Sequence, residues 1–419
     1  MEISIQGPKA QNWVLENGSK FILVEMPDAH MTCIDLWCKA GSSNEDIGEE
    51  GMAHFLEHMI FKGSHFYEAG EFDRHIESLG GSSNAATGFD DVHFHVLVPS
   101  NELEPACQAL LDLVLNPAIR TIDYEMEREV VLEEIAQHND QPDEKVFQAL
   151  LEVCWKNHSY SNPILGLKES LIKNTPNDMK KFHSKMYIPS NCCLSIAGPY
   201  DSGIKKIINN SLLARTNLNN QDIIPYKKIK KPRFNKGRRL IKIPRLEVPR
   251  LIMAWPASCA NQQMKLMGED IGTSILADGM SSRLVKHLRE ELKIVESIEM
   301  DITALEHGGL IILEACCKEK NIKYLEKEIA KILFDALYEE IQIEELKRSI
   351  KLIKNGFYFS LESTSQVASL AGSNTLWGRN QKLLDPLNYI ELWNEDKLKE
   401  QVFSLLQPEN CFTLIAIPD

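Results

Sequence analysis

Two histidines four residues apart, His54 and His58, are the residues of this 419-residue sequence best spaced for chemistry. They lie in the stretch His-Phe-Leu-Glu-His, whose apolar neighbours recur at helical spacing. Because residues four apart lie on one face of a helix, both imidazoles can bind the same ion. Glu57 lies beside the pair and is placed to hold a water molecule on that ion. Zinc fits this pattern, because it accepts neutral imidazole and a hydrolytic zinc site keeps one position open for water.

This order of residues is the reverse of the commoner His-Glu-x-x-His zinc helix. The alternative is a surface helix that carries two solvated histidines and a glutamate. A third protein ligand separates the two interpretations, because a catalytic zinc ion usually has three protein ligands, of which one is often a carboxylate.

The best source of that ligand is the glutamate-rich stretch 125–135, which follows a suitable helix cap at Thr121. Glu127 and Glu134 are two helical turns apart and share a face that can point toward a neighbouring helix. The alternative is a salt-bridged outer surface, which is typical of glutamate-rich helices. The apolar face of the same helix is predicted from residues at helical spacing, namely Met126, Val130, Val131 and Ile135.

Three segments, in this order, resemble the pitrilysin family of inverted zinc peptidases. They read His-Phe-Leu-Glu-His-Met-x-Phe-Lys-Gly at 54–63, Gly-Gly-x-x-Asn-Ala at 80–85 and Glu-Arg-x-Val-Val-Leu-x-Glu at 127–134. A fourth segment, 281–290, resembles a signature of the family's second half. By chain length the most similar branch is the one that includes mitochondrial processing peptidase and its bacterial relatives.

The resemblance implies a zinc-dependent metalloendopeptidase that hydrolyses peptides or presequences bound in extended form. It implies that His54, His58 and Glu134 bind one zinc ion per chain and that Glu57 is the general base. Glu127 would support the site by orienting a histidine or the helix. Manganese or cobalt in the same site stays open, since imidazole and carboxylate suit both.

Two features of the following strands concern the substrate. By the same resemblance, Asn84 and Ala85 lie on a strand that pairs with extended substrate backbone, a role suited to the free N–H and C=O groups of an edge strand. His93 and His95 share one face of the next predicted strand. We expect no third ligand near this pair, and the helical pair already accounts for a metal. We therefore expect His93 and His95 to line the substrate chamber at most.

The predicted fold is α+β, with two homologous domains that are each a mainly antiparallel sheet covered by helices. The length exceeds the usual limit of one hydrophobic core. An internal repeat supports two domains, because Pro-Ser-Asn-Cys at 189–192 returns as Pro-Glu-Asn-Cys at 408–411. We expect a catalytic zinc-binding domain at 1–225, a basic linker at 226–240, and a non-catalytic homologous domain that encloses the substrate chamber at 241–419.

Composition excludes several classes of partner. The net charge of −14 argues against nucleic acid, and no apolar run is long enough to span a bilayer. The first residues lack the features of a secretory signal or a transit peptide, so we expect a cytoplasmic protein. Its ten cysteines are predicted to be small buried residues in a reducing compartment.

One segment departs from the family pattern. Active members usually place an arginine, with a tyrosine seven residues later, across the chamber from the zinc. Here Arg289 is present, but Glu296 stands in the place of the tyrosine. An ionised carboxylate cannot donate a hydrogen bond to a developing oxyanion. We therefore expect a heterodimer with a paralogous subunit that supplies the arginine–tyrosine pair, or alternatively a homodimer that uses another donor.

Two other functions remain alternatives for this fold. One is a non-catalytic core or scaffold subunit, and the other is a peptide-binding module that holds extended peptides without cutting them. The intact predicted ligand set argues against the first.

Overall fold

The computed structural model describes residues 7–216, 229–379 and 382–419. The chain divides into two compact units, each with its own sheet and hydrophobic core. The predicted α+β class, with two sheets that helices cover, is confirmed. The first unit comprises residues 1–136, 163–229 and 359–384, and the second comprises residues 137–162, 230–358 and 385–419.

The first unit is built on a six-stranded sheet with the strand order β1-β2-β6-β3-β5-β4. Only the β2–β6 pair is parallel, and the other four pairs are antiparallel. The strand predicted for Asn84 and Ala85 is β4, which lies at one edge of this sheet. The strands are β1 (Lys9–Val14), β2 (Lys20–Glu25), β3 (Met31–Cys38), β4 (Ser82–Thr87), β5 (Val92–Pro99) and β6 (Cys192–Gly198).

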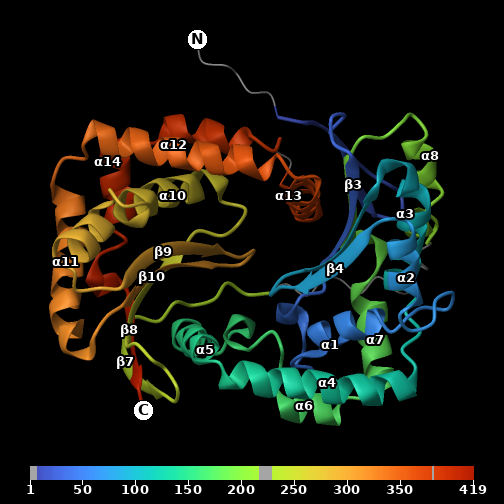
Figure 1. The fold of residues 1–419 in the computed structure, drawn as a ribbon, viewed down its shortest axis with the longest axis horizontal. Coiled ribbons are helices and arrows are strands. Elements are labelled where there is room, and N and C mark those ends of the chain that lie inside the picture. The colour runs from blue at the N-terminus through green and yellow to red at the C-terminus, as the bar shows by residue number, and fades with distance from the viewer. Residues whose placement is uncertain (1–6, 217–228, 380–381) are drawn as a thin grey trace. The chain divides into compact units, whose positions relative to one another are not determined.

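Helices cover both faces of this sheet (Figure 1). Side chains alternate along β3, so that Ile34 and Leu36 join the main core, whereas Cys33 and Trp37 face α13 (Thr364–Leu376). The helix α13 comes from the second half of the sequence. The other helices are α1 (Met52–Ile60), α2 (Glu71–Ser78), α3 (Leu103–Leu115), α4 (Thr121–Asp140), α6 (Lys168–Lys173), α7 (Pro176–Met186), α8 (Ile204–Asn209) and α9 (Leu212–Arg215).

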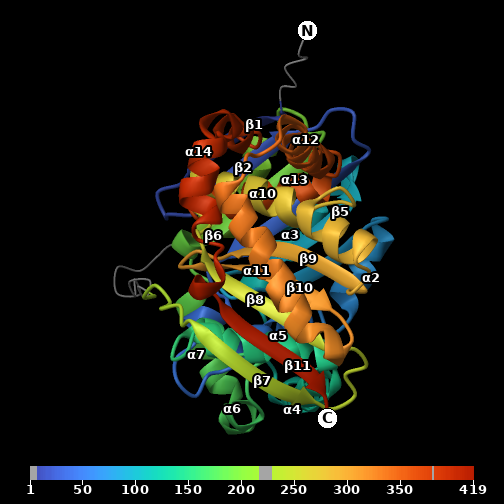
Figure 2. The same cartoon turned by 90° about the vertical axis from the view of Figure 1, so that its left-hand side faces the viewer.

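The second unit has a five-stranded sheet with the strand order β7-β11-β8-β10-β9 (Figure 2). Its last strand, β11, pairs in parallel with β7 and antiparallel with β8, as β6 does with β2 and β3. The repeated sequence thus leads into equivalent strands. The elements are α5 (Pro142–Cys154), β7 (Gly237–Ile243), β8 (Arg250–Ala257), α10 (Gln263–Ala277), β9 (Ser297–Ala304), β10 (Gly309–Cys316), α11 (Ile322–Tyr338), α12 (Ile343–Ser360), α14 (Glu395–Leu398) and β11 (Phe412–Pro418).

Two segments belong to a different compact unit from the residues that flank them in the sequence. Residues 137–162 belong to the second compact unit and residues 359–384 to the first. Strand β7 begins at Gly237, inside the range predicted as a basic linker, and residues 217–228 lie outside the described part of the chain. The boundaries at 225 and 241 stay a prediction.

The apolar face predicted for α4 is partly wrong. Met126 and Val130 are 60% and 51% exposed, whereas Tyr124, Val131 and Ile135 are buried. Residues 124 and 126 point in nearly opposite directions on a helix with 3.6 residues per turn. The buried face therefore follows Tyr124, and the predicted set mixed residues from both sides.

Two further expectations concern the cysteines and the absence of a membrane-spanning helix. All ten cysteines lack a disulfide, and nine of them are buried, as predicted for small core residues. Within the described ranges, no helix combines the length and the apolar character that crossing a membrane requires.

Candidate metal centre

The helix α1, which carries both histidines, starts at a glycine and is capped from outside. Gly51 has φ +94°, a left-handed conformation that favours glycine, and a Cβ there would lie 2.7 Å from the Leu165 carbonyl oxygen. The partly buried Glu45 carboxyl accepts hydrogen bonds from the backbone N–H groups of Gly51 at 3.0 Å and Ala53 at 2.8 Å. It thereby satisfies donors that a helix start leaves unpaired. Burial raises the pKa of Glu45 to about 8, although these two bonds oppose the shift.

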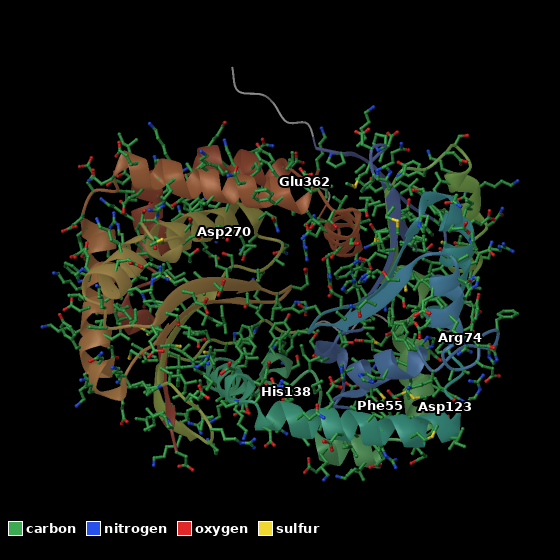
Figure 3. The ribbon with its side chains drawn as sticks, in the orientation of Figure 1. Phe55, Arg74, Asp123, His138, Asp270 and Glu362 are labelled. Atoms are coloured by element: carbon green, nitrogen blue, oxygen red, sulfur yellow. The ribbon has the colours of Figure 1, made fainter. Side chains whose placement is uncertain are left out.

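The apolar side of α1 anchors it in the core. Phe55, labelled in Figure 3, packs its ring 4.7 Å from that of Tyr124 on α4. Met52, Leu56 and Met59 are also fully buried. This packing fixes α1 against α4 and leaves the histidine-bearing side of α1 facing the Glu134 side chain.

The structure brings three predicted ligands together. Nε2 of His58 lies 3.4 Å from Oε2 of Glu134, and Nε2 of His54 lies 3.8 Å from the same oxygen. The two imidazole rings are 4.8 Å apart. Ligand atoms bound at 2.0–2.1 Å in a tetrahedron are about 3.3 Å apart, so the three groups are near ligating distance.

The polarity of this cluster fits a cation. The Glu134 side chain is 42% exposed as a whole, yet its Oε2 atom is shielded from solvent and has no hydrogen-bond partner among the described residues. A shielded carboxylate oxygen without a donor is costly. Burial, and then the neighbouring His58, lower the pKa of His54 to about 4, which keeps that imidazole in the neutral form that binds metals. A divalent ion would satisfy all three groups.

Glu127 contacts the nitrogen of His58 that faces away from Glu134. It is 7% exposed, and its Oε1 accepts a hydrogen bond from Nδ1 of His58 at 2.9 Å. Its Oε2 lies 2.6 Å from Nζ of Lys62. Because an ionised carboxylate only accepts, Nδ1 of His58 carries the proton and Nε2 keeps its lone pair toward Glu134. This is the carboxylate–histidine arrangement that orients metal ligands.

Glu57 lies on the same helix and is held by a strand residue. The Thr87 hydroxyl donates a hydrogen bond to Oε2 of Glu57 at 2.5 Å. Burial raises the pKa of Glu57, while the Thr87 hydrogen bond opposes this shift. Such a carboxyl takes up a proton more readily than an ordinary glutamate, as a general base must.

Other predicted site residues lie on separate elements. Asn84 is exposed on the edge strand β4, and its Oδ1 accepts a hydrogen bond from the Ala85 backbone N–H at 2.9 Å. Arg289 and Glu296 belong to the second unit, where Nε of Arg289 bonds Oε1 of Glu290 at 2.8 Å.

The expectation that no third ligand lies near His93 and His95 is wrong. Asp35, on β3, lies directly opposite His95 on β5, and its Oδ1 is 3.0 Å from Nδ1 of His93. Antiparallel pairing of β3 with β5 brings this carboxylate close, although it is far from both histidines in the sequence.

Three supporting residues, Glu45, Lys62 and Thr87, were not predicted to belong to the site. Lys62 lies one helical turn after His58, so its spacing alone could have linked it to the cluster. Glu45 and Thr87 lie in a loop and a strand whose approach to α1 depends on tertiary packing.

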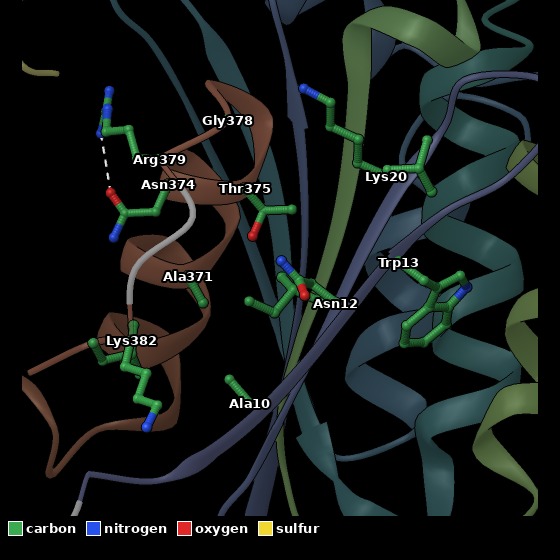
Figure 4. A pocket seen from close by; sticks show the side chains of 13 residues that line it. Ala10, Asn12, Trp13, Lys20, Ala371, Asn374, Thr375, Gly378, Arg379 and Lys382 are labelled. Carbon is green, nitrogen blue, oxygen red and sulfur yellow. Dashed lines mark hydrogen bonds between the residues drawn. The ribbon is translucent and has the colours of Figure 1, made fainter. Parts of the chain in front are cut away.

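A cavity of about 660 Å³ elsewhere in the first unit shares no lining residue with the histidine–glutamate cluster. Figure 4 shows Lys20, Arg379 and Lys382 around it, together with residues of β1 and α13. Nζ of Lys20 bonds the Leu376 carbonyl oxygen at 2.5 Å. Pocket size therefore does not identify the candidate metal centre, which is recognised by its ligand atoms.

Comparison with known proteins agrees with this geometry. Residues 20–168 match the family described as insulinase (peptidase family M16), and residues 173–353 match the domain described as the peptidase M16 inactive domain. A zinc protease of Rickettsia bellii is 29% identical over 362 residues, 86% of each chain. The zinc protease YmxG of Bacillus subtilis is 26% identical over 401 residues, 94% of this chain and 96% of the relative.

Solved structures share the fold. The crystal structure of a protease from Helicobacter pylori matches with a TM-score of 0.90 and 23% identity, over 98% of this chain and 100% of that one. An M16-like peptidase from Alicyclobacillus acidocaldarius matches with a TM-score of 0.88 and 20% identity, over the whole of both chains. The two family matches, which together cover most of residues 20–353, show that the chain belongs to peptidase family M16, the insulinase family.

Proposed function

We propose that this chain is a zinc-dependent metalloendopeptidase of the processing-peptidase type, which hydrolyses peptides bound in extended form. One zinc ion per chain is held by His54, His58 and Glu134. The observation that carries this proposal is the convergence of two Nε2 atoms on a shielded carboxylate oxygen that lacks a donor. Family membership supports it.

Each residue around the proposed ion has a separate role in the reaction. When bound, zinc lowers the pKa of a coordinated water and polarises the scissile carbonyl. Glu57 takes the proton from that water and passes it to the leaving amine. Since Thr87 occupies Oε2 of Glu57, we assign Oε1 to the water. Glu127 holds the His58 ring through Nδ1, so that Nε2 points at the ion.

Two substitutions separate the base from the ligand. Glu57→Gln removes the proton acceptor but no metal ligand, so it should retain zinc and lose nearly all activity. Glu134→Gln should lower zinc content after dialysis, measured by mass spectrometry, because a neutral amide is a poorer ligand. The same metal analysis of the native chain distinguishes zinc from manganese or cobalt. Retained turnover in Glu57→Gln contradicts the base assignment, and full zinc retention in Glu134→Gln contradicts the ligand set.

The extended substrate is proposed to pair with β4. Within the described residues β4 pairs only with β5, and so one edge of β4 offers backbone groups to a peptide. Thr87, at the end of β4, bonds Glu57, which links this strand to the base. Asn84→Ala should raise KM more than it lowers kcat, and an unchanged KM speaks against this placement.

We further propose a heterodimer in which a paralogous subunit supplies the arginine–tyrosine pair. The support is Glu296 at the position of the tyrosine, together with the pairing of Arg289 with its neighbour Glu290. The chain alone should cleave an internally quenched peptide slowly, and addition of the native partner, recovered by pull-down, should raise the rate. An equal rate for the chain alone as a stable homodimer supports the homodimer instead.

Glu296 also favours one second candidate, a peptide-binding module that holds peptides without cutting them. Zinc content combined with a cleavage assay separates the two functions. A zinc-loaded chain that binds extended peptides but shows no cleavage, alone or with its partner, is the outcome expected of the binding module. The cytoplasmic location stays a prediction from the sequence.

A further inference from the structure

A second cluster of metal-binding side chains lies on the sheet of the first unit. Asp35 on β3 lies opposite His95 on β5, and Trp37, two residues further along β3, lies opposite His93. All four side chains therefore project from the same face of the sheet, the one that α13 covers. One ligand atom from each of Asp35, His93 and His95 lies within 4.8 Å of the others.

Packing holds these side chains in place. Asp35 is 1% exposed, and its Oδ1 is 3.0 Å from Nδ1 of His93. The His93 ring stacks against Trp37 at 4.3 Å and against His95 at 5.5 Å, with the ring planes within 16° of parallel in both pairs. A site whose rings are fixed before binding loses little side-chain entropy when an ion arrives.

One nitrogen atom of this cluster lacks a hydrogen-bond partner among the described residues. Nδ1 of His95 is shielded from solvent and has no hydrogen-bond partner in the part of the chain that the structure describes. Leaving such a group unsatisfied costs about 1–3 kcal/mol. Asp35, buried directly opposite on β3, provides the charge that would attract a cation to this nitrogen.

The cluster opens into a cavity of about 480 Å³. One wall is the face of β3 and β5 that carries Asp35, Trp37 and both histidines. The other comes mainly from α13, whose Ser365, Ser369 and Ser373 recur every four residues and so present hydroxyls on one side of the helix. There is space for an ion with water molecules in its remaining coordination positions, and polar groups to bind those waters.

We propose that Asp35, His93 and His95 form a second divalent metal site, separate from the centre at His54, His58 and Glu134. Two imidazoles and one carboxylate suit a first-row transition ion such as Zn²⁺ or Co²⁺, whereas Ca²⁺ and Mg²⁺ prefer oxygen ligands alone. The ion bridges β3 and β5, of which β5 pairs with the edge strand β4. Its binding requires no ligand of the first centre.

The test is metal stoichiometry of the full-length chain, which is independent of peptidase activity. The chain is stripped with a chelator, equilibrated with Zn²⁺ buffered at micromolar free concentration, and analysed by mass spectrometry. Wild type should bind two ions. His95→Gln should bind one and His58→Gln should bind one. The double variant should bind none. His65→Gln removes an exposed histidine outside both clusters and should keep two ions.

Two results overturn the proposal. One is a single ion per wild-type chain at saturation, and the other is two ions in His95→Gln. Retention of the ion at the first centre shows that His95→Gln is folded. If that variant fails to fold, anomalous diffraction at the zinc edge from wild-type crystals decides, since it either shows a peak between Asp35 and His95 or shows none.

Discussion

The hydrogen bond from Thr87 to Glu57 leads to a sharp prediction about pH dependence. A hydroxyl that donates to a carboxylate stabilises the ionised form, so its removal should raise the pKa of Glu57 above its already raised value. Hydrogen bonds to charged groups contribute about 1.5–3 kcal/mol, and one pKa unit corresponds to about 1.4 kcal/mol. Because the proposed base must be ionised, Thr87→Val should move the acidic limb of kcat/KM upward by about 1 to 2 pH units.

The assay is cleavage of an internally quenched peptide library between pH 5 and pH 8, with zinc content measured for each variant. Valine keeps the shape and the strand preference of threonine, so the fold should be retained. Ser83→Ala is the matched control, since Ser83 lies on the same strand but donates to Asp73 on α2, at 3.1 Å. The reasoning is refuted by an unmoved acidic limb in Thr87→Val, or by an equal movement in Ser83→Ala.

Three further predictions concern the support of the metal centre. Glu127→Ala should weaken zinc binding by about 10–100-fold in a competition titration with a chelator, because Nδ1 of His58 loses its acceptor; unchanged affinity contradicts this. Gly51→Ala should lower the free energy of unfolding by more than about 1 kcal/mol in urea titration, since it combines a left-handed backbone with a clash against a carbonyl oxygen; a smaller loss speaks against strain at this turn. The folded-state pKa of Glu45 is about 8 against an ordinary value of 4.5, so the folded chain binds the proton more tightly and stability should fall as pH rises through this window. Glu45→Gln should flatten that fall in urea titrations at pH 5 and pH 8, and an identical pH dependence in both proteins refutes it.

Local features of the sequence predicted that the three candidate ligands His54, His58 and Glu134 come together. Spacing alone places His54 and His58 on one helical face, and the glutamate-rich stretch folds as α4 with Glu134 directed at them. The choice between Glu127 and Glu134 as the nearest carboxylate needed the family resemblance. The structure separates them clearly, since Glu127 contacts Nδ1 of His58 and Glu134 faces Nε2.

The contacts that could not be predicted from the sequence depend on residues that are far apart along the chain. Asp35 reaches His93 and His95 through the register of β3 against β5, which no spacing along the chain reveals. Thr87 reaches Glu57 in a similar way, from the end of β4. On α4, Met126 and Val130 are apolar yet exposed, because hydrophobic residues are not confined to the interior.

The position of α13 has a consequence for biosynthesis. One face of the sheet that carries β3 and β5 is covered by α13, which is synthesised more than 260 residues after β5. Until then Trp37 and its neighbours lack their covering helix, and the nascent protease has an incomplete fold. The first unit should therefore complete its fold only after α13 has been synthesised.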